Sequence, residues 1–177
     1  MKKTRRITLC AVLLALALAL AYMERFFPLQ LIVPLPGVKL GLANVVSLVA
    51  LYYLDGKSAY IILALRCLLS SVFGGGITSL LFSFTGGTLS MLAMVLAKRA
   101  RFLSVYGVSI LGAAAHNIGQ ICAAMLLMHS VYIGAYLSYL LIVALFTGFA
   151  TGAAGAGVLR VLTNIDFKRS GDNTSGA

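Results

Sequence analysis

The feature that most constrains this chain is the length of its stretches without charged side chains. Residues 102–159 include no Lys, Arg, Asp or Glu. A helix crosses the hydrocarbon core of a bilayer with about 20 mainly apolar residues, so this stretch is long enough for two crossings. Hydrophobic residues make up 61% of the chain and charged residues 10%, whereas soluble domains carry roughly 25% charged residues. The sequence therefore predicts an all-α integral membrane protein.

The apolar stretches divide into six expected spans. Their approximate ranges are 7–23, 38–54, 59–73, 77–97, 103–128 and 132–159. The division of the longest stretch falls near His129–Gly134, where its polar residues gather. We expect residues 1–165 to form a single transmembrane domain, a bundle of six helices. The segment 166–177 is small and polar, which predicts a disordered tail.

Basic residues alternate with the expected spans and set their orientation. The terminal segments and every second connection carry most of them: Lys2, Lys3, Arg5, Arg6, Lys57, Lys98, Arg99, Arg101, Arg160, Lys168 and Arg169. The other connections carry Arg25 and Lys39. By the positive-inside rule both termini are cytoplasmic, which agrees with an even number of spans in a bacterial cytoplasmic membrane. Because topology explains the net charge of +10, nucleic acid is not an expected partner.

The N-terminal segment has a second interpretation. Its basic start, apolar run and Ala19–Ala21 also resemble a cleavable signal peptide. Cleavage would leave five spans and an external N-terminus. We favour retention, because the run is long and begins a regular bundle.

Acidic residues are too few for most enzyme chemistry. The four are Glu24, Asp55, Asp166 and Asp172, and no two of them lie close together within the predicted bundle. Magnesium sites and two-carboxylate catalysis need such pairs. Cys10, Cys67 and Cys122 form no C-x-x-C motif. The sequence thus predicts no enzyme, no metal site and no cofactor.

Arg66 is the most informative polar residue, because it lies in the middle of the third expected span. A charge at the centre of a bilayer usually faces a cavity or a partner. No acidic residue lies inside any expected span, so we predict that Arg66 meets an anionic group of a ligand. The alternative is that its side chain extends to an interface or bonds to backbone carbonyls.

Further polar residues are expected at a similar depth. His116, Asn117 and Gln120 have the spacing of one helix face in the fifth span. Asn44 in the second span and Thr85 in the fourth could reach them. We favour a ligand site, while hydrogen bonding between helices remains the alternative. His116 has no second metal ligand at suitable spacing.

Two segments suggest further roles. Residues 24–37 form an apolar loop stiffened by three prolines, which fits either a lid over the bundle or a loop in the headgroup layer. Ala11, Ala15 and Ala19 repeat every four residues, a pattern typical of close helix contacts. That face serves either internal packing or docking of another membrane protein. Glycines 148, 152, 155 and 157 allow the same two interpretations, and for them we favour internal packing.

Several segments together resemble one bacterial family. They are Pro36–Asn44, Arg66 with Ser70–Gly75, Gly86–Ser90, Gly107–Ser109 and His116–Gln120. The chain resembles the Gx transporter family, also called heptaprenyl diphosphate synthase component I, over most of residues 8–160. That family is similar to the substrate-binding S components of energy-coupling factor (ECF) transporters. The resemblance implies a six-helix bundle with a lid loop after the first helix, and an Ala-x-x-x-Ala face that meets the coupling protein.

These observations leave three hypotheses. The first is an S component that binds a small, anionic vitamin-, flavin- or prenyl-phosphate-like compound, at Asn44, Arg66, Thr85, His116, Asn117 and Gln120. No Walker motif is present, so a transmembrane coupling protein and ATPase subunits would be its partners. The second is a noncatalytic membrane subunit of heptaprenyl diphosphate synthesis, since the chain lacks Asp-rich motifs. The third is a structural bundle with a dry interior.

Overall fold

The computed structural model describes residues 3–26, 39, 41–100 and 102–174, without the side chains of residues 25, 74–75 and 166–174. The described part of the chain is helical and contains no strand. Its elements are α1 (Lys3–Met23), η1 (Glu24–Phe26), α2 (Asn44–Tyr53), α3 (Gly56–Ser70), the π-helical turn η3 (Ser71–Gly75), α4 (Gly76–Arg99), α5 (Val105–Met128), η4 (Val131–Ala135) and α6 (Tyr136–Thr174).

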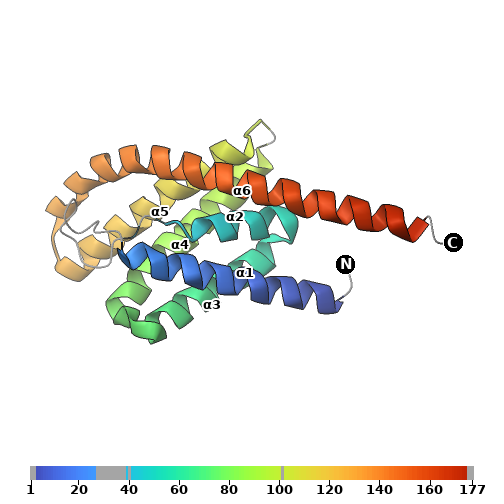
Figure 1. Ribbon diagram of the computed structural model, residues 1–177. Helices are drawn as coiled ribbons and strands as arrows, with labels where there is room; N and C mark the ends of the chain where they lie inside the picture. The colour runs from blue at the N-terminus through green and yellow to red at the C-terminus, as the bar shows by residue number, and fades with distance from the viewer. Residues whose placement is uncertain (1–2, 27–38, 40, 101, 175–177) are drawn as a thin grey trace.

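Five of the described helices are long and apolar enough to cross a membrane. They are α1, α3 with the start of η3, α4, α5 and η4 with most of α6. The all-α prediction is confirmed for the described residues, and these helices are compatible with a membrane bundle. In Figure 1 these helices run side by side, and both termini lie at the same end of the bundle. We call this end the basic end, because Lys57, Lys98 and Arg99 also lie at helix ends there.

The second expected span, 38–54, is a half-length helix. The helix α2 covers only Asn44–Tyr53, because Gly41 adopts a φ of 81° that no right-handed helix contains. Residues 41–43 are therefore largely buried without being part of the helix. The expected lid, 24–37, lies mostly outside the described residues, which begin again at Lys39.

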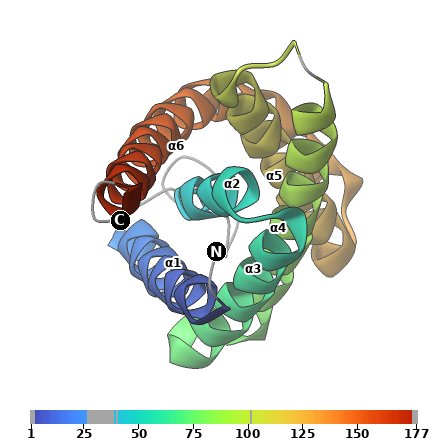
Figure 2. The same cartoon turned by 90° about the vertical axis from the view of Figure 1, so that its right-hand side faces the viewer.

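The short helix α2 lies in the centre of the bundle. Viewed along the bundle in Figure 2, the other helices surround it, and it contacts α1, α3, α4, α5 and α6. Its sequence is mostly apolar, as a buried helix requires, with Asn44 and Ser47 as buried polar residues. The buried side chains include Val46, Leu48, Val49, Ala50 and Leu51. Because this central helix is short, the part of the bundle interior beyond its N-terminus is available to side chains from the other helices.

The basic end is fastened by polar contacts between α1 and α3. Asp55 caps α3 by accepting a hydrogen bond from the Ser58 amide at 2.6 Å. Arg6 on α1 forms an ion pair with the same carboxylate and donates to Ser58 Oγ at 2.7 Å. The hydrogen bond from the Ser58 amide is the main reason that the pKa of Asp55 lies below its usual value, and Arg6 adds to it.

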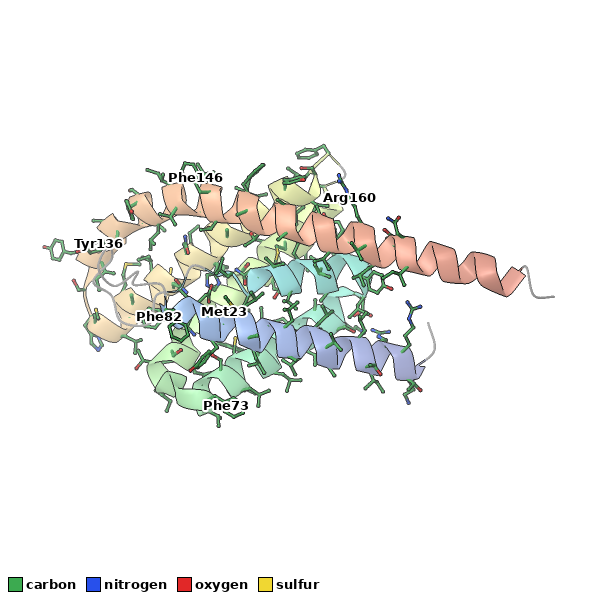
Figure 3. All side chains as sticks on the ribbon, viewed as in Figure 1. Met23, Phe73, Phe82, Tyr136, Phe146 and Arg160 are labelled. Carbon is green, nitrogen blue, oxygen red and sulfur yellow. The ribbon has the colours of Figure 1, made fainter. Side chains whose placement is uncertain are left out.

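The outer surface of the bundle is apolar. Phe73, at 67% exposure, and Phe146, at 74%, project from it (Figure 3). Such a surface suits contact with lipid, because exposure of a large apolar surface to water is unfavourable. At the C-terminus, α6 continues to Thr174, beyond residue 165 where we expected the helical domain to end. The described tail continues this helix past the apolar segment that ends at Ile165.

Glycines bring α6 close to its neighbours. A Cβ atom added to Gly148 would lie 2.6 Å from the backbone of Ile110 on α5. Cβ atoms on Gly152 and Gly155 would lie 3.1 Å from Tyr106 and 2.8 Å from Leu48. Ser109 and Thr151 also share a buried hydrogen bond of 2.9 Å across α5 and α6. Internal packing is thus confirmed for these three glycines, while Gly157 has no neighbour within 4 Å.

The contrast within α6 gives a testable result for stability. We expect Gly148→Ala to lower the free energy of unfolding by about 1–3 kcal/mol, because the added methyl group meets backbone that cannot rotate away. Gly157→Ala is the matched control, since the same change there meets open space and favours the helix. Thermal unfolding in mild detergent measures both variants. Equal melting temperatures would contradict the packing described above.

Candidate functional site

A small enclosed cavity lies where the end of α1 meets α3, α4 and α5. The chain that leads into α2 covers one side of it. Its lining residues are Ala21, Glu24, Lys39, Gly41, Arg66, Cys67, Ser70, Ser83 and His116. The label on Met23 in Figure 3 marks the end of α1 beside which Glu24 lies. The cavity volume is about 10 Å³, which is room for roughly one water molecule. The structure therefore shows this site in a closed state.

Arg66 lines the cavity and is 5% exposed. Among the described residues it forms no hydrogen bond or ion pair, although its charge acts on both Glu24 and His116. A buried guanidinium group has five N–H donors to satisfy. The donors of Arg66 are therefore available to an acceptor inside the cavity.

Glu24 is the residue that our sequence reasoning missed. We expected no acidic partner for Arg66, but the carboxylate of Glu24 is 6% exposed and lines the same cavity. It accepts a hydrogen bond from the Leu42 amide, so it links the end of α1 to the chain that leads into α2. Burial raises the pKa of Glu24, while the amides of Leu42 and Gly41 and the charges of Arg66 and Lys39 oppose that rise.

Lys39 closes the cavity from the other side. Its ammonium group donates to Ser79 Oγ at 2.9 Å and to Ser83 Oγ at 2.8 Å, both on α4. Its backbone N–H donates to Gln120 Oε1 at 3.3 Å. In turn, Gln120 Nε2 donates to His116 Nε2 at 3.0 Å on α5. The cavity thus combines two cations, one carboxyl group and several hydroxyl groups.

Asn44 lies beside the cavity at the start of α2. A Cβ atom on Gly41 would lie 2.9 Å from Asn44 Nδ2 and 3.1 Å from His116 Cδ2, so Asn44 and His116 both flank this glycine. The side chain of Asn44 is 6% exposed, and neither its Nδ2 nor its Oδ1 has a hydrogen-bond partner among the described residues. Buried amide groups are nearly always paired, so this residue is suited to meet a polar group that enters the site.

Two of the six predicted ligand residues face elsewhere. Asn117 Nδ2 donates to the Leu140 carbonyl on α6 at 2.7 Å, a buried contact between helices. Thr85 Oγ1 donates to the Leu81 carbonyl of its own helix at 2.7 Å. Neither residue lines the cavity. The structure therefore brings Arg66, His116 and Gln120 together with Asn44 nearby, and it gives Asn117 and Thr85 structural hydrogen bonds.

Close packing of α4 on α5 fixes this arrangement. A Cβ atom on Gly119 would lie 2.8 Å from Gly86 Cα, and one on Gly86 would lie 2.9 Å from the His116 carbonyl oxygen. The two backbones are thus in direct contact one turn from His116. Glycine at both positions is what allows α4 to hold Ser83 against the same cavity as His116.

The alanine stripe of α1 faces outward. Ala11, Ala15 and Ala19 are exposed, whereas Leu13, Ala17 and Ala21 on the opposite side are buried in the bundle. Internal packing therefore does not use the stripe. Within the described residues, no group of three or more His, Cys, Asp or Glu side chains could hold a metal ion.

Comparison with known proteins gives one family match. A family model described as heptaprenyl diphosphate synthase component I matches residues 13–158. This range takes in every residue that lines the cavity. No curated protein and no solved structure matches the chain.

Proposed function

Since the chain belongs to the heptaprenyl diphosphate synthase component I family, we propose that it is the noncatalytic, ligand-binding membrane member of a larger assembly. In this proposal it is the S component of an ECF-type importer for a small anionic compound that resembles a vitamin, a flavin or a prenyl phosphate. The importer would lie in a bacterial cytoplasmic membrane with both termini of the chain inside.

The observation that carries this proposal is the closed, charged cavity around Arg66. A purely structural bundle has no use for a buried guanidinium group that lacks a hydrogen bond among the described residues. With Glu24 ionised, the two cations Arg66 and Lys39 leave one positive charge in excess. An anionic group such as a carboxylate or phosphate would balance it, and Asn44 and His116 would orient the rest of the ligand.

Entry of a ligand requires the cavity to open. Its present volume admits about one water molecule. Lys39 and Gly41 form the one described wall of the cavity that is not helical. Opening on this side requires Lys39 to release at least Ser79, Ser83 and Gln120, and Leu42 to release Glu24.

The first test is native mass spectrometry of the full chain purified in mild detergent. A bound anionic metabolite supports the proposal and names its class. The same compound, added back to ligand-free protein, must raise the melting temperature in proportion to the logarithm of its concentration. A protein that neither carries nor is stabilised by any anionic metabolite of a cell extract would contradict it.

The exposed alanine stripe gives a test of the partner. We expect Ala15→Trp to abolish co-purification with the ECF coupling protein and ATPase subunits, because a large side chain prevents close approach of a second helix. Leu16→Trp is the matched control, since Leu16 is also exposed but lies to one side of the stripe. Equal recovery of the assembly with both variants would exclude this face as the contact.

The description of the family favours a second candidate function. The chain would then be a noncatalytic membrane subunit associated with a soluble prenyl diphosphate synthase. Stable co-purification with such a synthase, and a change in its product length when this chain is removed, would support that role. Failure of both would leave the binding proposal as the remaining function.

A further inference from the structure

A second hollow lies far from the cavity, at the basic end of the bundle. It is a groove of about 1180 Å³ between α3 and α4, with α2 behind it, and it shares no lining residue with the cavity. Its walls include Leu51, Ile61, Met91, Leu92 and Val95. Ile61 is 58% exposed and Leu92 is 54% exposed, so the groove opens sideways on the apolar outer surface.

The mouth of this groove carries three basic residues and one acidic residue. Lys57, Lys98 and Arg99 line it together with Asp55. The carboxylate of Asp55 is already held by Arg6 and by the Ser58 amide. The ammonium group of Lys98 donates to the Leu51 carbonyl at 2.7 Å and lies 4.7 Å from the centre of the Tyr52 ring.

Of the four charged residues at the mouth of the groove, Lys57 and Arg99 are therefore the two that take no part in these contacts. Within the described part of the chain, neither has a hydrogen-bond or ion-pair partner. Both lie at helix ends, Lys57 in the first turn of α3 and Arg99 at the last residue of α4. Two uncompensated cations at the mouth of an apolar groove are suited to an anionic head on a hydrocarbon chain.

We propose that this groove binds an anionic phospholipid of the surrounding bilayer. The phosphate would lie on Lys57 and Arg99, and one acyl chain would lie along Ile61 and Leu92. Basic pockets between membrane helices near the headgroup layer are known to bind anionic lipids, and each cation contributes about 1 kcal/mol. A lipid reaches the groove through its open side, whereas a small soluble anion would leave the apolar walls unused.

Lipid retention measured by native mass spectrometry tests the charged mouth. The full chain is exchanged into detergent with equal amounts of phosphatidylglycerol and phosphatidylcholine. We expect the wild-type protein to retain phosphatidylglycerol preferentially, and Lys57→Gln/Arg99→Gln to reduce that retention about 30-fold. The control Lys3→Gln/Arg160→Gln removes the same net charge from α1 and α6 outside the groove and should change little.

Substitutions in the wall test the position of the acyl chain. Leu92→Trp fills the groove, while Leu96→Trp lies one turn along α4, has the same 54% exposure and does not line the groove. We expect only the first to reduce retention. Equal retention by both tryptophan variants, or by both charge variants, would overturn the proposal. Displacement of phosphatidylglycerol by an equimolar prenyl diphosphate would overturn its assignment to a bilayer lipid.

Discussion

Arg66→Gln is expected to weaken binding of the co-purified ligand about 100-fold. The side chain is 5% exposed and lines the closed cavity. Loss of one partner from a buried, hydrogen-bonded charge pair costs roughly 2–5 kcal/mol, which includes the cost of leaving the other charge unpaired. Titration of the ligand-free protein, followed by intrinsic fluorescence or by calorimetry, measures the dissociation constant.

Two further variants make this result specific. Arg66→Lys keeps the charge but not the planar fork of donors. Its affinity for the ligand should therefore lie between those of the wild-type protein and Arg66→Gln. Arg160→Gln removes an exposed arginine of α6 and should leave the affinity unchanged. The melting temperature of each ligand-free variant separates a loss of binding from a loss of fold. An Arg66→Gln protein that is folded and binds as tightly as wild type would exclude Arg66 from the site.

Ligand affinity is expected to rise as the pH falls. The total rise should be on the order of tenfold for each unit by which the bound ligand raises the pKa of Glu24. Burial raises the pKa of Glu24 above the usual value of a glutamate. Protonation of Glu24 removes the negative charge that opposes an anion and leaves Arg66 and Lys39 to attract it. A bound anion beside the carboxyl group raises the pKa of Glu24 further, so the increase should occur between the pKa of Glu24 in the complex and its lower, already raised pKa in the ligand-free protein.

Two acidic residues provide the comparison for this pH dependence. In Glu24→Gln the side-chain oxygen can still accept a hydrogen bond from the Leu42 amide, but the side chain cannot ionise. The affinity of this variant for the ligand should therefore be high and nearly independent of pH. Asp55→Asn changes a carboxylate that lies outside the cavity and has a lowered pKa, so it stays ionised over the same range. That variant should keep the wild-type pH profile. A profile that is unchanged in Glu24→Gln would assign the pH dependence to another group.

The helices were predictable because hydrophobic length alone decides which segments can cross a bilayer. The expected span 77–97 lies within α4, and the expected span 103–128 begins two residues before α5 and ends with it. The expected span 38–54 was wrong at residues 41–43, because composition cannot separate a buried turn from a buried helix. Gly41 has a positive φ before the helix begins, and a Cβ atom there would meet Asn44 and His116, a tertiary neighbourhood that composition does not show.

The candidate site was predictable only in part. A charge in an apolar run is costly wherever it lies, so Arg66 was identifiable without a structure. The rotation of each helix about its axis was not identifiable. That rotation turns Asn117 toward Leu140 on α6, and it turns His116 on the same helix into the cavity. The scarcity of acidic residues was the one signal that could have indicated Glu24, which follows directly after α1.

By itself, the sequence determined the membrane environment, the helical class, the placement of both termini at one end and the presence of a buried cation. These properties follow from the cost of moving charge and unpaired backbone into hydrocarbon, which is local to each segment. Tertiary structure decided which charges meet. Glu24, Lys39 and Arg66 belong to different segments, and only the packing of α1, α3 and α4 around the short central helix brings them to one cavity.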